Sequence, residues 1–195
     1  TNLIPALESG DLDLKGTRVL DVATGTGAMA LLAAHFGATR VVATDIHPVA
    51  LVNTAYNAQI GGWQEVIGAR LVTPDAAGAF DPIATDETFD VIFCNPPWET
   101  GRAKRFEEHL DADPGRQLIR SLLDGLERHL APGGKLVMIY GPVEGLRFIL
   151  ENVESRGWKA DITWDGRSQP LAEFLTRGID FAPTVGVPPM LVISR

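Results

Sequence analysis

The sequence predicts one doubly wound α/β domain, whose mostly parallel sheet carries helices on both faces. Short apolar runs typical of buried strands alternate with helical patterns along most of the chain, and strands separated by helices in this way pair in parallel. The chain has 195 residues, 45% of them hydrophobic and 22% charged, as in an ordinary soluble domain. No internal repeat is visible. We therefore expect residues 1–195 to form a single domain.

The expected strands are short runs rich in Val, Ile, Leu and Phe. They lie at residues 18–22, 40–45, 69–72, 89–94, 135–140, 158–164 and 190–194, and the run at 69–72 is the weakest. Sheets of this kind bind ligands outside the carboxyl ends of their strands. The residues directly after each strand are therefore the first candidates for function.

The expected helices lie at residues 28–36, 48–60, around 118–130, and 146–156. The second begins at Pro48, a residue suited to a first helical position, and stops at Gly61-Gly62. The third ends at Pro132-Gly133-Gly134 and is the best amphipathic segment, because its apolar residues share one face: Leu118, Ile119, Leu122, Leu123, Leu126 and Leu130.

The composition excludes several classes of protein. Cys94 is the single cysteine, so the chain can form neither an internal disulfide nor a cysteine-built zinc site. No apolar run reaches the length of a membrane span and no signal peptide is visible, which favours a cytoplasmic location. We assign no metal to the four histidines, which show no ligand spacing: His35, His47, His109 and His129.

The charge balance bears on partners. The chain carries 17 Lys and Arg against 25 Asp and Glu, a formal net charge of -8. This disfavours a protein that binds nucleic acid by its own electrostatics, although a local basic patch or a partner chain can supply the charge. The chain opens at Thr1 and not at methionine, as a processed product or a fragment does. A missing N-terminal recognition segment therefore stays a candidate.

A glycine-rich turn follows the first strand, in the run Asp21-Val22-Ala23-Thr24-Gly25-Thr26-Gly27. Two interpretations fit it. Gly25 and Gly27, with Ala30 three residues on, match the dinucleotide fingerprint, in which Asp45 after the second strand would bind the ribose. In the other, Asp21 at the strand end faces a cation, such as the amino group of S-adenosylmethionine (SAM), and not a pyrophosphate.

The second interpretation rests on a resemblance. An acidic residue followed by alternating glycines resembles the first motif of the class I SAM-dependent methyltransferases, whose fold has seven strands. The resemblance implies a SAM site made by three loops. The first loop lines the methionine part with Asp21, Ala23, Thr24, Gly25 and Gly27. The second holds the ribose with Asp45 and Ile46, and the third contacts the adenine with Asp75 and Ala76. Ala23 departs from the family, which usually has glycine there.

The tetrapeptide Asn95-Pro96-Pro97-Trp98 follows the fourth strand directly. Two prolines stop the strand and stiffen the backbone. The Asn95 side-chain oxygen and the Pro96 carbonyl are then two fixed acceptors for an NH2 group, and Trp98 offers a flat face for a planar amide or base. Such acceptors can draw the hydrogens of a planar nitrogen and aim its lone pair at a methyl group. A dehydrogenase has no use for this arrangement.

Asn-Pro-Pro-aromatic is the signature of methyltransferases that act on planar nitrogens. The chain most closely resembles the release-factor glutamine methyltransferases and related small-domain RNA methyltransferases, over roughly residues 1–164. Two departures put a glutamine acceptor in question: Trp98 stands where tyrosine is usual, and the N-terminal helical domain of the bacterial enzymes is lacking. In those enzymes an upstream segment lies over the cofactor, and residues 1–4 resemble its end.

We therefore expect SAM-dependent methylation of a planar nitrogen, with Asn95, Pro96, Pro97 and Trp98 at the acceptor. A glutamine-like side-chain amide of a protein is the first acceptor class. An RNA or DNA base, at adenine N6 or guanine N2, and a small molecule are the alternatives, and the acidic balance favours protein or small molecule. A SAM-binding module without catalysis is the fourth hypothesis, and the intact tetrapeptide argues against it.

Two segments are candidates for choosing the acceptor. Arg102, Lys104 and Arg105 follow the tetrapeptide, and Arg116 and Arg120 begin the next helix. The charge of this basic cluster suits a phosphate or carboxylate, although acidic residues come directly after Arg105. Residues 165–189 are long for a connection between the last two strands. Such an insertion can form a wall of the substrate pocket.

Overall fold

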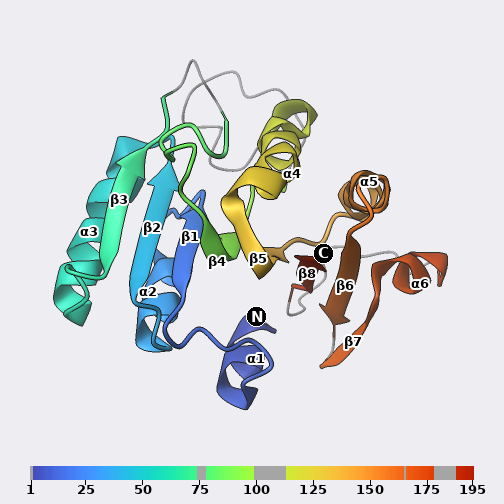
Figure 1. Ribbon diagram of the computed structural model, residues 1–195, viewed down its shortest axis with the longest axis horizontal. Coiled ribbons are helices and arrows are strands. Elements are labelled where there is room, and N and C mark those ends of the chain that lie inside the picture. The colour runs from blue at the N-terminus through green and yellow to red at the C-terminus, as the bar shows by residue number, and fades with distance from the viewer. Residues whose placement is uncertain (1, 74–77, 99–112, 165, 178–187) are drawn as a thin grey trace.

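The computed structural model describes residues 2–73, 78–98, 113–164, 166–177 and 188–195, and within them eight strands form one sheet in the order β3-β2-β1-β4-β5-β8-β6-β7 (Figure 1). The strands are β1 Arg18–Val22, β2 Arg40–Asp45, β3 Ile67–Leu71, β4 Phe89–Cys94, β5 Leu130–Ile139, β6 Lys159–Trp164, β7 Arg167–Pro170 and β8 Met190–Ser194. β1 to β5 pair in parallel, whereas β8 pairs antiparallel with β5 and β6, and β7 antiparallel with β6.

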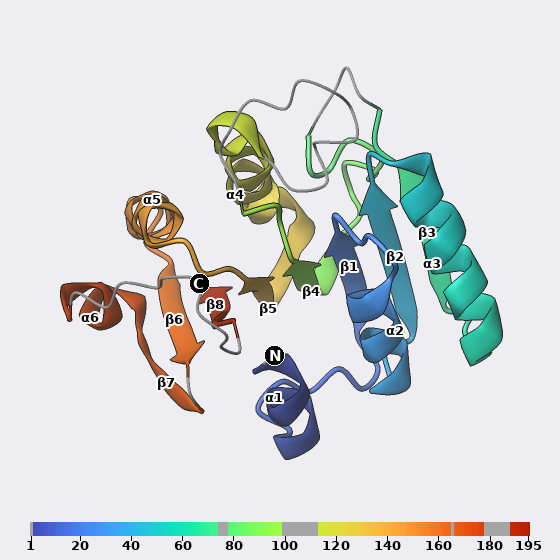
Figure 2. The ribbon, with the colours of Figure 1, turned by 180° about the vertical axis from the view of Figure 1, so that it is seen from behind.

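Helices cover both faces of this sheet (Figures 1 and 2). They are α1 Leu3–Ser9, α2 Ala28–His35, α3 Pro48–Gly61, α4 Gln117–His129, α5 Val143–Glu154 and α6 Leu171–Thr176, with a short 3-10 helix η2 at Pro114–Arg116. Successive strand residues point to opposite faces, so Val19 packs with α1, α2 and α3, and Leu20 packs with α4, α5 and α6. The predicted doubly wound α/β class is confirmed.

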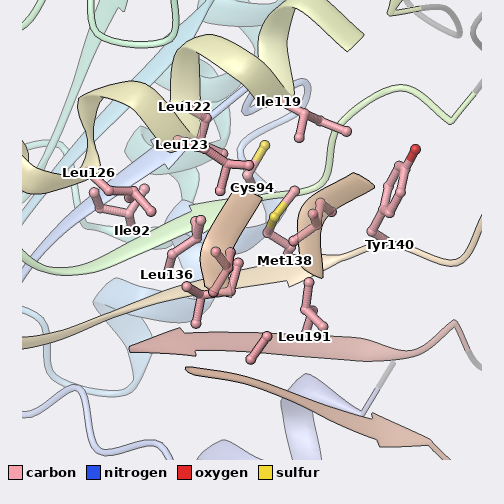
Figure 3. Packing of buried hydrophobic residues seen from close by; sticks show 14 of the residues in the cluster. Ile92, Cys94, Ile119, Leu122, Leu123, Leu126, Leu136, Met138, Tyr140 and Leu191 are labelled. Atoms are coloured by element: carbon pink, nitrogen blue, oxygen red, sulfur yellow. The ribbon is translucent and has the colours of Figure 1, made fainter. Parts of the chain in front are cut away.

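The amphipathic segment is α4, and its predicted face is buried. Ile119 and Leu122 are fully buried, and Leu123 and Leu126 nearly so, against strand residues such as Ile92, Leu136 and Met138 (Figure 3). Each buried side chain of this kind contributes about 1.5–3 kcal/mol relative to an exposed one. The packing of this face fixes the position of α4 on the sheet, and so it places the N-terminus of α4 near the carboxyl ends of β4 and β5.

Some element boundaries differ from the sequence prediction. β3 spans Ile67–Leu71 and not 69–72, because it is an edge strand with only Ile67 buried, and an edge strand has a weak apolar pattern. β5 begins at Leu130, so Pro132-Gly133-Gly134 lies inside a strand that pairs irregularly with β4. A Cβ at Gly134 would lie 2.9 Å from the Asp90 carbonyl oxygen, which explains the glycine there.

Four elements went unpredicted: α1, η2, β7 and α6. β7 and α6 fall within the segment 165–189, and β7 is the strand by which the sheet exceeds the expected seven. All four are seven residues or shorter, so their periodicity is too brief to detect in the sequence.

None of the helices in the described part of the chain is long and apolar enough to cross a membrane.

Candidate functional site

The glycine-rich loop and the tetrapeptide start side by side. β1 and β4 pair in parallel, and Val22 is the register partner of Cys94. Ala23 and Asn95 are the next residues along the two strands, so both segments leave the same edge of the sheet. β2 and β5 flank this pair of strands and bring Asp45 and Tyr140 to the same edge.

Asp21 is a buried carboxylate at the base of the loop. Its Oδ2 accepts a hydrogen bond from the Thr24 hydroxyl at 2.6 Å and one from the Ala30 backbone N–H at 3.0 Å. Burial raises the pKa of Asp21 to about 7; these two hydrogen bonds lower it, and the nearby charge of Asp45 raises it further. A buried carboxyl poised near neutral pH is well suited to a cationic ligand, which would favour its ionised form.

The loop after Asp21 is held by α3. The Thr54 hydroxyl donates to the Gly25 carbonyl oxygen at 3.2 Å, and the Asn57 side-chain amide donates to the Thr26 carbonyl oxygen at 2.9 Å. Gly27 has a φ of 83° and caps the N-terminus of α2, and a Cβ there would lie 2.9 Å from Thr54 Cγ2. Only glycine therefore allows this close approach of the loop to α3.

Ala23 adopts the left-handed conformation with a φ of 56°, one of two non-glycine residues in the described chain to have a positive φ. An L-residue in this conformation costs about 1–2 kcal/mol. The departure from glycine noted in the sequence therefore falls at a position where glycine relieves strain. Backbone strain of this kind is often concentrated where a loop is shaped for a ligand.

Asp45 ends β2 beside the glycine-rich loop. Its Oδ2 accepts a hydrogen bond from the Gly25 N–H at 2.9 Å, and its Oδ1 accepts one from the His47 N–H at 2.8 Å. Both oxygens are thus fixed in place by backbone groups, and each keeps a lone pair for a further donor. Ile46, between Asp45 and His47, is half-buried.

The tetrapeptide presents its first and last residues to solvent. Asn95 is exposed, Pro96 is buried, Pro97 is half-buried and Trp98 is 38% exposed. The Trp98 ring meets the Tyr140 ring edge-on, with centroids 6.4 Å apart. The buried Pro96 anchors the backbone next to the exposed Asn95, so the Asn95 side chain has a fixed base from which to meet an acceptor.

A polar cluster of Asp113, Arg116 and Tyr140 lies beneath Trp98; the sequence placed Arg116 in the basic cluster beside the site, and Tyr140 was missed. Tyr140, directly after β5, is 1% exposed, and the Arg116 guanidinium donates a hydrogen bond to its hydroxyl oxygen. Burial raises the pKa of Tyr140, and the hydrogen bond and charge of Arg116 oppose this rise. Asp113 is buried nearby and accepts hydrogen bonds from the Leu118 and Ile119 N–H groups, which open α4. The positive φ of Arg116 has no signature in the sequence.

Cys94 lies at the end of β4 and is fully buried. Burial is the main cause that raises the pKa of its thiol, so the thiol stays protonated and is a poor nucleophile. No group of three His, Cys, Asp or Glu side chains able to hold a metal occurs among the described residues.

Several predicted site residues lie outside the described residues: Asp75, Ala76, Arg102, Lys104 and Arg105. Of the segment 165–189, residues 166–177 and 188–189 are described. α6 packs into the core through Leu171 and Phe174. The end of the segment lies near the tetrapeptide, because a Cβ at Gly141 would be 3.5 Å from the Trp98 ring and 3.6 Å from Pro189 Cδ.

The N-terminal residues meet the same edge of the sheet. The Asn2 side-chain amide donates to the carbonyl oxygens of Thr163 and Pro188, both at 3.2 Å. Leu3 and Leu7 of α1 are buried in the core formed with α2. The start of the described chain is therefore tied to the end of the 165–189 segment.

Comparisons with known proteins find methyltransferases. Residues 3–96 match the family model of ribosomal protein L11 methyltransferase (PrmA). The release factor glutamine methyltransferase of Cereibacter sphaeroides is 33% identical over 151 residues, which cover 71% of this chain and 51% of that protein. The ribosomal protein L11 methyltransferase of Deinococcus radiodurans is 45% identical over 110 residues, 56% of this chain and 40% of that protein.

A solved structure shows the same fold. The crystal structure of ribosomal protein L11 methylase from Lactobacillus delbrueckii subsp. bulgaricus aligns with a TM-score of 0.64 and 20% identity, and the alignment covers 98% of this chain and 76% of that one. The class is thereby defined: the chain has the class I methyltransferase fold, and the resemblance seen in its motifs is confirmed. Its sequence relatives include protein glutamine methyltransferases and ribosomal protein L11 methyltransferases. The chain spans about half the length of the release factor relatives it matches.

Proposed function

We propose that this chain is the catalytic part of a SAM-dependent N-methyltransferase whose acceptor is a glutamine-like side-chain amide of a protein. The observation that carries the proposal is the register of β1 and β4, which sets Asn95 beside the glycine-rich loop. The names of the relatives, for release factors and ribosomal proteins, support a protein acceptor. Such acceptors occur in the cytoplasm, where we place the enzyme.

The loop residues fit SAM. The buried Asp21 carboxyl suits the amino group, and Asp45 keeps two fixed oxygens that suit a ribose diol. The space beside Gly25 is open within 4 Å, so a ligand can approach the backbone there, beside Ala23 and Thr24. We assign Ile46, Asp75 and Ala76 to the same site by resemblance. Bound SAM supplies an electrophilic methyl group on its sulfonium sulfur.

The tetrapeptide then acts on the acceptor nitrogen. The lone pair of an amide nitrogen is delocalised, which makes it a poor nucleophile. Hydrogen bonds from its NH2 group to the Asn95 side-chain oxygen and the Pro96 carbonyl oxygen weaken that delocalisation and orient the nitrogen. Pro97 stiffens the turn, and the exposed part of Trp98 packs on the planar amide. The proton is lost after the nitrogen becomes cationic, so no ionised base is required before attack.

The proposal also covers the segments that would surround the acceptor. We treat residues 1–195 as one domain and the segment 165–189 as a wall of the acceptor pocket. Its end at Pro189 lies near Trp98, since a Cβ at Gly141 would be 3.6 Å from Pro189 Cδ and 3.5 Å from the Trp98 ring, and this proximity supports the assignment. We assign Arg102 and Arg105 to acceptor binding from their sequence position. An additional segment or partner chain that recognises the acceptor is compatible with the length of the relatives.

Transfer of a tritiated methyl group from SAM into a fractionated cell extract tests the acceptor class. We expect the label in protein. Hydrolysis of the labelled protein in strong acid should release it as volatile methylamine, because an N-methyl amide is cleaved there, whereas methylated lysine and arginine survive. Label in RNA, DNA or small molecules, or retained on a methylated amino acid, would contradict an amide acceptor.

Two substitutions separate catalysis from cofactor binding. Asn95→Ala should reduce methyl transfer by about 100-fold or more, since one positioned polar group of this kind contributes about 3 kcal/mol, while the SAM dissociation constant changes little. Asp45→Ala should first weaken SAM binding. Calorimetric titration with SAM beside a turnover assay measures both. Unchanged turnover in Asn95→Ala, or an unchanged SAM dissociation constant in Asp45→Ala, would show that the role assigned to that residue is wrong.

A further inference from the structure

A row of large apolar side chains faces solvent on α3. Val49, Val52, Tyr56 and Ile60 are 69%, 67%, 63% and 69% exposed. Their spacings of three, four and four residues place them on one face of the helix, and we call this set the α3 stripe. Single exposed apolar side chains are common on protein surfaces, but a continuous row of four marks a binding surface.

The fold does not account for the α3 stripe. On the inner face of α3 the buried residues are small: Ala50, Thr54 and Ala58. They let the helix approach the sheet and the glycine-rich loop closely. Most helices on a sheet bury large apolar residues and expose polar ones, and α3 does the reverse. Packing within the described chain therefore does not explain the large apolar side chains on its outer face.

The surface of α3 also carries no charge. Pro48–Gly61 contains no Asp, Glu, Lys or Arg, in a chain with 42 such residues (17 + 25) and a net charge of -8. A charged partner would find no opposite charge on this helix. Two copies of an acidic chain repel each other over most of their surfaces, and a charge-free face is where that repulsion is smallest.

We propose that the α3 stripe is the contact surface of a two-fold homodimer, in which α3 of one copy packs against α3 of a second copy. A two-fold axis needs only one self-complementary patch, and a neutral apolar row meets that condition. An apolar patch of this kind measures on the order of 500 Å². Two patches face to face would bury on the order of 1,000 Å², which is the lower limit for a specific interface and predicts weak, reversible association.

This contact would lie behind the candidate site. The inner face of α3 holds the glycine-rich loop through Thr54 and Asn57, so a second copy on the outer face would steady the helix that supports the loop. The homodimer does not depend on the proposed function, because it can be measured without SAM or an acceptor.

Sedimentation velocity of the whole chain from about 1 to 100 µM tests the dimer. We expect a monomer at the low end and a dimer at the high end, at moderate salt. Val52→Glu places a charge in the stripe and should leave the chain monomeric throughout. Ser168→Glu is the matched control: it adds the same charge at an exposed position on β7, at the opposite end of the sheet from β3, and should dimerise as the unaltered chain does. Circular dichroism checks that both variants are folded.

A second variant keeps the test decisive if Val52→Glu does not fold. Val52→Cys adds an exposed thiol to a chain whose own Cys94 is fully buried. Mild oxidation should join two copies through residue 52, whereas Ser168→Cys should not react in this way. A chain that stays monomeric at 100 µM overturns the proposal, as does a dimer that survives Val52→Glu. A monomer that retains a different protein from an extract, and loses it in Val52→Glu, would assign the stripe to that partner and also overturn the homodimer.

Discussion

Acidification should weaken SAM binding through one carboxyl group, that of Asp21. Burial raises its pKa to about 7, so the group is mostly protonated in the free protein at pH 5.5 and 6.5. An ammonium group bound beside it would require the ionised form, so binding releases a proton. With this pKa the ionised fraction grows from about 3% at pH 5.5 to about 24% at pH 6.5, and the SAM dissociation constant should fall about eightfold.

An ordinary carboxyl group would give no pH dependence in this range. At the usual pKa of 3.8 the group is ionised at both pH values, and affinity would not change. An α-amino group stays protonated over this range, so SAM itself adds no pH dependence. Titration calorimetry at pH 5.5 and 6.5, in two buffers of different ionisation enthalpy, gives both the affinity and the number of protons released.

Asp21→Asn is the control, because its side-chain oxygen can still accept hydrogen bonds from Thr24 and Ala30. This variant should bind SAM more weakly, with an affinity that no longer depends on pH between 5.5 and 6.5. A change of less than twofold in the unaltered protein would refute the reasoning. The sign for stability follows from the same raised pKa: without ligand, Asp21 makes the free energy of unfolding decrease as the pH rises from about 4 to about 7.

Two further predictions concern the glycine-rich loop, and urea denaturation measures both. Ala23→Gly should raise the free energy of unfolding by about 0.5 kcal/mol, because relief of the strain at a φ of 56° exceeds the entropy gained by the unfolded chain; a loss above 1 kcal/mol would contradict the strain. Gly27→Ala should cost about 2–4 kcal/mol, since its Cβ would meet Thr54 at 2.9 Å in addition to the strain of a φ of 83°. Gly25→Ala is the control, because Gly25 has a φ of 57° but no atom lies within 4 Å of the position of its Cβ. This variant should lose about 1–2 kcal/mol of unfolding free energy from backbone strain alone. Equal losses in Gly25→Ala and Gly27→Ala would exclude the clash with Thr54.

The long elements of the fold were predictable because their patterns are strong. β1, β2 and β4 match their predicted bounds, since strands buried on both faces are nearly continuous apolar runs. The end of α4 was predicted to within a residue or two, but the Pro132-Gly133-Gly134 run expected to end the helix lies inside β5. β7 and α6 escaped prediction because each is only a few residues long and forms by packing on β6 and α5.

The candidate site was predictable where it is local in sequence. Asp21 lies at the end of β1, Gly25 and Gly27 follow that strand, and the tetrapeptide follows β4, so a single stretch of chain carries each motif. Arg116 was predicted as part of the basic cluster, but its contact with Tyr140 joins the start of α4 to the end of β5, so no local pattern marks that contact. The roles of all these residues in binding and catalysis stay predictions.

The sequence by itself determined the alternation of strands and helices, the two motifs and the chemistry that they suggest, because these properties reside in neighbouring residues. Only the tertiary structure decided that the motifs leave the sheet side by side, since strand order and register depend on contacts between distant segments. It also decided that the backbone of Ala23 is left-handed and that α3 turns its large apolar residues outward. Which face of a helix is buried depends on what packs against it, and in α3 close packing admits only small residues.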